Sequence, residues 1–173
     1  MNILVQPFTT PQRGLNVNAQ GFVDSAAVTR MYEAVRCAKQ WTHFPELVAL
    51  LRNAGHRVVQ IGGAGDPSVA ADEFVQNPSW AKICSMLDEC DTWVAVDSFL
   101  QHANDVHAKK PGVVIWSKSN PLLFGYAYNR NLLKSREQLR PDQWGVWLGL
   151  PHNESDFPGY EDVFREVQTQ LGI

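Results

Sequence analysis

The chain has 173 residues, of which 45% are hydrophobic and 19% charged, and its formal net charge is −3. This length predicts one domain, spanning residues 1–173, with a substantial core, and the composition is typical of a globular protein in water. An acidic balance without a basic run argues against binding to a phosphate backbone, so we expect no nucleic-acid partner. No apolar stretch approaches the roughly 20 residues that a membrane span needs, and the amino terminus has no basic leader. We therefore expect no membrane span and a cytoplasmic location.

The amino-terminal third predicts two strands separated by helices. Ile3–Val5 is a short apolar run that ends before Pro7, and a polar loop containing Arg13 follows. Apolar residues between 26 and 38 recur at helical spacing, and a second helix is expected from Pro45 to Gly55. The next strand, Val58–Ile61, runs into a glycine-rich turn that ends at Asp66, which we interpret as a turn residue.

The rest of the chain continues the alternation. Helices are predicted at 78–87, 100–107 and 160–171, and strands at Trp93–Val96 and Val113–Ile115. Residues 120–153 have no clear periodicity and are predicted to be irregular. Strands that alternate with helices in this way predict a Rossmann-like α/β fold, a three-layer sandwich around a mainly parallel sheet.

The cysteines and the acidic residues carry no metal signature. Cys37, Cys84 and Cys90 are odd in number and have no CxxC spacing, which favours reduced, buried thiols. No group of His, Asp and Glu has the spacing of metal ligands, so no metal is predicted.

Polar residues follow two successive strands of the predicted sheet. Asp97 and Ser98 come directly after Val96, and Ser117 and Lys118 come directly after Trp116. Parallel strands bring their carboxyl ends to one edge, where the next helix presents unpaired N–H groups and a partial positive charge. The sequence therefore predicts an anion site where the strands ending at Gln6, Val96 and Trp116 converge, against the helix that starts near Phe99.

Each candidate side chain also has a structural interpretation. Asp97 at a strand end is more typical of a helix cap, and His102 is as typical of a hydrogen-bonded interior histidine as of a ligand. Arg13 and Lys118 are of types that are usually solvated. Three aromatic residues of the irregular region fit either a base pocket or packing in a core or interface: Tyr126, Tyr128 and Trp144.

Several motifs occur in one order along residues 2–130. The chain begins with ILVQP at 3–7 and continues with GHRVVQIGGAGD at 55–66, DSFLQH at 97–102 and KPGVVIWSKSNP at 110–121. This series resembles the C-terminal, donor-binding half of GT-B glycosyltransferases, most closely the family-nine, heptosyltransferase-type enzymes. It departs from the family pattern at Phe99-Leu100, where the family usually has Gly-Pro, and residues 14–44 resemble an inserted helical segment.

The resemblance implies a glycosyltransferase-like protein that binds a nucleotide or nucleotide-sugar donor, with the nucleotide sugar as substrate and no other cofactor. It implies that the donor phosphates are bound by Arg13, Asp97, Ser98, His102 and Lys118, with Asp97 orienting its loop or binding a donor hydroxyl. No catalytic residue is assigned, because in the family the base comes from the other, acceptor-binding half. Since that half is not among the 173 residues, we expect a homo-oligomer or an acceptor-domain partner, with 14–44 and Trp144–Trp147 as contact surfaces.

Two other functions remain open from the sequence. The chain could be a non-catalytic nucleotide-sugar binding module, or a nucleoside or nucleotide hydrolase that uses Asp97 or Asp66 as acid or base on the same sheet. Fold resemblance alone does not separate these functions.

Overall fold

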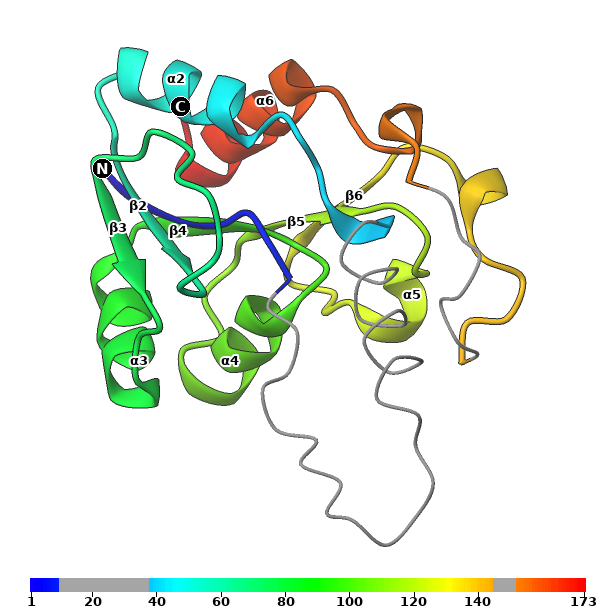
Figure 1. Cartoon of the computed structure of the whole chain (residues 1–173), viewed down its shortest axis with the longest axis horizontal. Coiled ribbons are helices and arrows are strands. Elements are labelled where there is room, and N and C mark those ends of the chain that lie inside the picture. Colours follow the sequence, from blue (N-terminus) through cyan, green and yellow to red (C-terminus); the bar gives the residue numbers. More distant parts are fainter. Residues whose placement is uncertain (10–37, 145–151) are drawn as a thin grey trace, which may run out of the picture.

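The computed structural model of the chain describes residues 1–9, 38–144 and 152–173. Arg13, Cys37, most of the predicted helix at 26–38 and most of the segment 14–44 lie outside the described residues, as do residues 145–147 of the second predicted contact surface. The described strands form one six-stranded sheet in the order β3-β2-β1-β4-β5-β6 (Figure 1). The strands are β1 (Asn2–Gln6), β2 (Arg57–Gly62), β3 (Glu73–Gln76), β4 (Thr92–Val96), β5 (Val113–Trp116) and β6 (Arg130–Leu133).

All five strand pairings are parallel, which confirms the predicted fold class. At the centre, Leu4 of β1 lies opposite Val59 of β2 and Trp93 of β4. Every residue of β4 and β5 is buried. The four strands predicted from continuous apolar runs are all present. Such runs are typical of strands that are covered on both faces.

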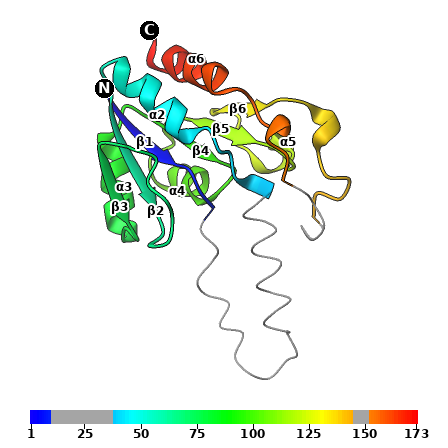
Figure 2. The ribbon, with the colours of Figure 1, turned by 45° about the horizontal axis from the view of Figure 1, so that its top comes forward.

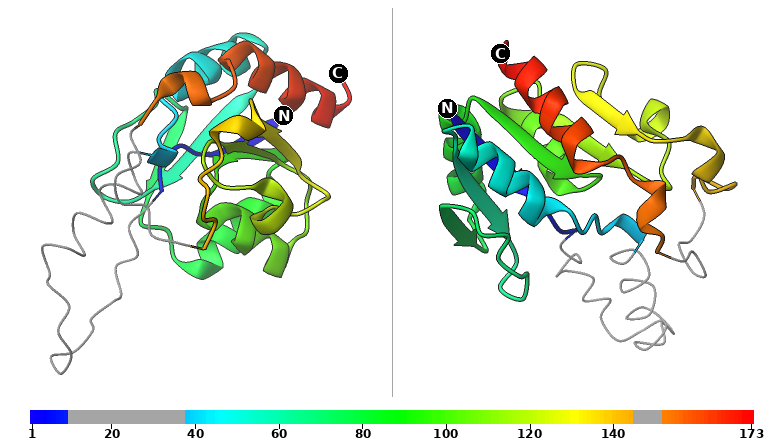
Figure 3. Two further views of the ribbon diagram at one scale, coloured as in Figure 1. Left: turned by 90° about the vertical axis from the view of Figure 1, so that its right-hand side faces the viewer. Right: turned by 90° about the horizontal axis from the view of Figure 1, so that it is seen from above.

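Helices cover both faces of the sheet. The helices α2 (Phe44–Asn53) and α6 (Tyr160–Leu171) lie on one face, and α3 (Trp80–Glu89) and α4 (Phe99–His107) lie on the other (Figures 1 and 2). Seen from above, α2 and α6 run side by side across the sheet, and they pack against each other (Figure 3). The result is the predicted three-layer sandwich.

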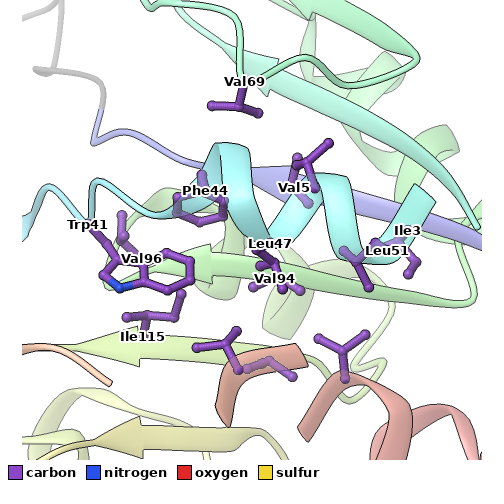
Figure 4. Close-up of a cluster of buried hydrophobic side chains, with 14 of the residues drawn as sticks. Ile3, Val5, Trp41, Phe44, Leu47, Leu51, Val69, Val94, Val96 and Ile115 are labelled. Atoms are coloured by element: carbon purple, nitrogen blue, oxygen red, sulfur yellow. The ribbon is translucent and has the colours of Figure 1, made fainter. Parts of the chain in front are cut away.

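The side chains of alternate strand positions enter two separate cores, as a strand's period of two dictates. Ile3, Val5, Val94 and Ile115 point toward α2 and α6, where they join a cluster that includes the fully buried Trp41 (Figure 4). The opposite face of the sheet packs against α3 and α4 through Leu4, Trp93, Ala95, Val114 and Trp116.

Five short elements of the described residues were not predicted: β3, β6, α5 and the 3-10 helices η1 (Arg136–Gln138) and η2 (Glu154–Asp156). The edge strands β3 and β6 have four residues each and are at most half-buried, so they carry no continuous apolar run. The helix α5 (Pro121–Phe124) is a single turn that begins at Asn120, whose side chain accepts a hydrogen bond from the Leu122 N–H. The segment 120–153 is therefore more ordered than its sequence indicates, because β6 is held by pairing with β5 rather than by its own periodicity.

Two further observations concern the described residues only. None of their helices has the length and apolar character needed to cross a bilayer. Both described cysteines, Cys84 and Cys90, are free thiols, and Cys90 is buried.

Candidate functional site

The sheet changes its direction of winding between β1 and β4. From β1 the chain proceeds outward through β2 to β3, and from β4 it proceeds outward on the other side through β5 to β6. In open α/β sheets, ligands bind outside the carboxyl ends of the strands at such a switch point. Here that point is flanked by Gln6, which ends β1, and by Asp97, which follows β4.

Gln6 joins the two strand ends directly. Its side chain is almost fully buried, and its Oε1 accepts hydrogen bonds from the Ser98 hydroxyl at 2.6 Å and the Leu100 N–H at 3.0 Å. Ser98 is the N-cap residue of α4, but its own side chain makes no capping bond. Gln6 therefore caps α4 from a neighbouring strand, and takes one of the N–H groups that the first turn leaves without an intrahelical partner.

Asp97 is a buried carboxylate held by charge and hydrogen bonds. Lys39 Nζ lies 2.6 Å from Asp97 Oδ2 and also donates to the Asp97 main-chain oxygen at 3.1 Å. On the other side, Gln101 Nε2 donates to Oδ1 at 3.0 Å. Among the described contacts, Asp97 makes no capping bond to a main-chain N–H of the first turn of α4.

A second cation faces the same carboxylate. Arg140 is buried and its main-chain N–H donates to the Lys118 carbonyl at 3.0 Å. Burial lowers the pKa of its guanidinium, and the negative charges of Asp97 and the exposed Asp142 oppose that shift. Among the described residues, the two cations Lys39 and Arg140 therefore lie near the Asp97 carboxylate.

The two polar residues after β5 serve as structural ties. The Ser117 hydroxyl donates to the Ala38 carbonyl at 2.8 Å, and the ammonium of Lys118 pairs with Asp156. Both groups of that ion pair are largely buried. Lys118 therefore lies at the predicted edge, but its positive charge is paired with the Asp156 carboxylate.

His102 is exposed, so its interpretation as an interior histidine is wrong. It lies on the outward side of α4 with Phe99 and Val106, while Leu100 and Gln101 face the sheet. Its Nδ1 is 3.0 Å from the Tyr126 hydroxyl. His102 is thus one turn into α4 from Ser98, beside the switch point rather than within it.

Three residues at this edge were not predicted from the sequence to bind a ligand or to support the site: Gln6, Lys39 and Arg140. Gln6 could have been found, because it ends a predicted strand with a polar side chain. Lys39 and Arg140 reach the edge from distant parts of the chain, and nothing in their local sequence indicates that. Of the predicted residues, Asp97 and Ser98 are at the switch point.

Two cavities lie away from this edge. One, of about 100 Å³, is at the amino end of the central strands and is lined by Ile3, Arg57, Met86 and Cys90, among others. Burial raises the pKa of the Cys90 thiol to about 11, which keeps it protonated and unreactive. The other is a shallow surface cavity beside Arg52, His56 and Asp72.

No protein-family model and no curated protein matches the sequence. Among solved structures, the chain is similar to the ADP-heptose lps heptosyltransferase II of E. coli, with a TM-score of 0.59 and 17% sequence identity. The match covers 98% of this chain and 46% of that one, so the chain spans slightly less than half the length of the transferase. At this identity the likeness is one of fold alone: the chain has a Rossmann-like α/β fold.

Proposed function

We propose that the chain binds the diphosphate of a nucleotide or nucleotide sugar at the carboxyl ends of β1 and β4, as the donor-binding domain of a glycosyltransferase-like protein. The observation that carries this proposal is the switch point itself, where Gln6 ties the start of α4 to β1 and Lys39 is held against Asp97. Strand ends, a helix amino terminus and fixed cations then converge on one place. That combination suits a phosphate.

The chemistry required of such a domain is to stabilise a leaving group. When the bond between the sugar carbon and the diphosphate oxygen breaks, negative charge accumulates on the diphosphate. The first-turn N–H groups of α4 other than that of Leu100, which Gln6 already accepts, would hydrogen-bond its oxygens, while Lys39 and Arg140 supply positive charge. A base that deprotonates the acceptor would come from a partner domain or a second copy.

A panel of ligands tests the proposal. Thermal unfolding would be followed with pyrophosphate, nucleoside diphosphates and nucleotide sugars, since a ligand at 100 times its dissociation constant stabilises a protein by about 2.7 kcal/mol. We expect stabilisation by pyrophosphate and more by at least one nucleotide sugar. No stabilisation by any member of the panel would reject the proposal.

Two variants test residues that the sequence resemblance assigns to the donor phosphates. Arg13→Ala and His102→Ala should each weaken binding of the best nucleotide by roughly 1–3 kcal/mol, the scale of hydrogen bonds to charged groups. Lys134→Ala is the control: this exposed residue follows β6, and its loss should change little. Calorimetric affinities equal to wild type for both site variants would remove these residues from the site.

The hydrolase alternative receives no support from the geometry. Asp97 is buried and engaged by Lys39 and Gln101, and Asp66 Oδ2 accepts the Gly63 N–H at 2.6 Å within its turn. A non-catalytic module would share the whole binding site. Turnover of a bound donor in the presence of acceptor separates the transferase from the module, and a free base as product would indicate the hydrolase.

A further inference from the structure

We propose that Tyr126 is a positioning residue for His102. It fixes the imidazole as the tautomer with its proton on Nε2, so that this N–H is available to an anionic oxygen bound at the amino end of α4. The ligand-facing part of this inference rests on the proposed function. The contact between the two side chains stands independently of it.

The contact is close and directional. The Tyr126 hydroxyl lies 3.0 Å from His102 Nδ1, and the two rings meet edge to face with their centroids 5.7 Å apart. Within the described residues, Nε2 of His102 has no protein partner. One ring nitrogen is thus held by the protein while the other remains open to a ligand.

Donor strength decides where the proton resides. Burial and the nearby Asp105 carboxylate raise the pKa of the Tyr126 phenol, so it keeps its proton at neutral pH. A phenol O–H is a good donor and a neutral imidazole nitrogen is a good acceptor, so we expect Tyr126 to donate to Nδ1. The imidazole proton then has to be on Nε2.

The ring of Tyr126 is supported by its neighbour Tyr128. Its ring stacks on Tyr128 at a centroid distance of 5.7 Å and an interplanar angle of 24°. The Tyr128 hydroxyl donates to Asp105 Oδ1 at 3.1 Å, one turn farther along α4 than His102. The two tyrosines therefore connect the segment after α5 to α4 at two successive turns.

The position of His102 on α4 directs its side chain toward the amino end of that helix. Side chains of a helix lean toward its amino terminus, so a residue in the first turn covers the start of the helix. His102 lies four residues after Ser98. Its side chain is therefore expected to lean toward the end of α4 where the phosphate is proposed to bind.

The test compares Tyr126→Phe with Tyr128→Phe, which removes the same hydroxyl from the stacked neighbour. Long-range ¹H–¹⁵N spectra recorded at about pH 8.5, where imidazole is neutral, report the tautomer of His102 without any ligand. We expect Nε2–H in wild type and in Tyr128→Phe, and a mixture of tautomers in Tyr126→Phe. Binding of pyrophosphate, measured by calorimetry, should weaken roughly 3- to 10-fold in Tyr126→Phe, the loss expected for one hydrogen bond, and should stay near wild type in Tyr128→Phe.

The outcomes separate this inference from the proposed function. The inference would be overturned if His102 of the wild type carried its proton on Nδ1, or if its tautomer were the same in wild type and Tyr126→Phe. Either result would count even if pyrophosphate binds. Pyrophosphate affinity unchanged in Tyr126→Phe would overturn the role in binding. If wild type bound no pyrophosphate, the proposed function and the ligand-facing part would fall together, while the spectra would still decide whether Tyr126 sets the tautomer.

Discussion

At the scale of single residues, the switch point depends on a buried carboxylate. Asp97 is 6% exposed and contacts Lys39 and Gln101 through different oxygens. A buried ion pair contributes little net stability when intact, but removing one partner leaves an uncompensated charge. Asp97 and Lys39 are therefore expected to tolerate joint replacement better than single replacement.

Lys39→Met should destabilise the protein by about 3 kcal/mol, because it removes the ammonium group that pairs with the buried Asp97 carboxylate. Chemical denaturation measures this loss, and adding Asp97→Asn in the same chain should recover part of it. Arg165→Met is the matched control, since Arg165 and Asp162 form an exposed ion pair 2.9 Å apart whose loss should cost under about 1 kcal/mol. Equal losses from Lys39→Met and Arg165→Met would contradict the account.

His56 should make stability depend on pH. It is buried, its Nε2 has no hydrogen-bond partner among the described residues, and burial followed by the charge of the amino terminus lowers its pKa below 6.5. The unfolded chain then takes up the proton first, so the His56 contribution is fully present above about pH 6.5 and declines as pH falls toward the folded pKa.

Urea midpoints at about pH 7.5 and pH 5.5 measure how much stability the protein loses as the pH falls. His56→Gln should flatten the decline between these values, whereas His107→Gln, which alters an exposed histidine, should leave it in place. A decline of the same size in His56→Gln would assign the pH dependence to other groups.

At the scale of elements, the sequence predicts the strands that have continuous apolar runs and the helices whose apolar residues recur at helical spacing. The helix 160–171 has the predicted bounds, and the four central strands lie where their apolar runs place them. The edge strand β6 could not be predicted, because its four residues, RNLL, acquire strand geometry from pairing with β5. The same reasoning applies to the site: Asp97 and Ser98 follow from a strand end, whereas Lys39 arrives by tertiary packing.

The carboxyl end of α3 depends on one lysine. Lys110 Nζ donates to the Leu87 carbonyl at 2.7 Å and the Asp88 carbonyl at 3.1 Å, and it also bonds the Cys90 carbonyl. A cation that satisfies the last carbonyls of a helix also complements the helix dipole.

Lys110→Met should therefore cost about 1–3 kcal/mol of stability, the range for losing hydrogen bonds to a charged group. Lys109→Met changes the exposed neighbour by the same substitution and should cost little. Denaturant midpoints of the two variants provide the comparison. A cost for Lys109→Met as large as that for Lys110→Met would mean that the capping contacts do not stabilise α3.

At the scale of the whole molecule, apolar side chains remain exposed near the carboxyl edge of the sheet. Trp80 and Phe99, at the starts of α3 and α4, are about half exposed and contact each other edge to face. Leu122 and Leu123 of α5 and the nearby Trp144 are also exposed. Clustered apolar exposure is typical of interaction surfaces.

We therefore expect concentration-dependent self-association, or capture of an acceptor domain, through this edge. Light scattering over a range of concentrations should show a rising mass, and replacing Leu122 and Leu123 together by Ser should reduce it. Lys134 and Arg136, which are exposed after β6, offer a control pair for Ser replacement. A strictly monomeric wild type at high concentration that also binds no partner domain would contradict this expectation.

We expect an anionic ligand to bind at the carboxyl ends of β1 and β4. Amide chemical-shift mapping during titration with ADP, and separately with pyrophosphate, tests it most directly. We expect the largest shifts for both probes at Gln6 and between Asp97 and His102, with little change at Asn2, Arg57 and Cys90 beside the amino-end cavity. Largest shifts around that cavity, or no shifts with either probe, would contradict it.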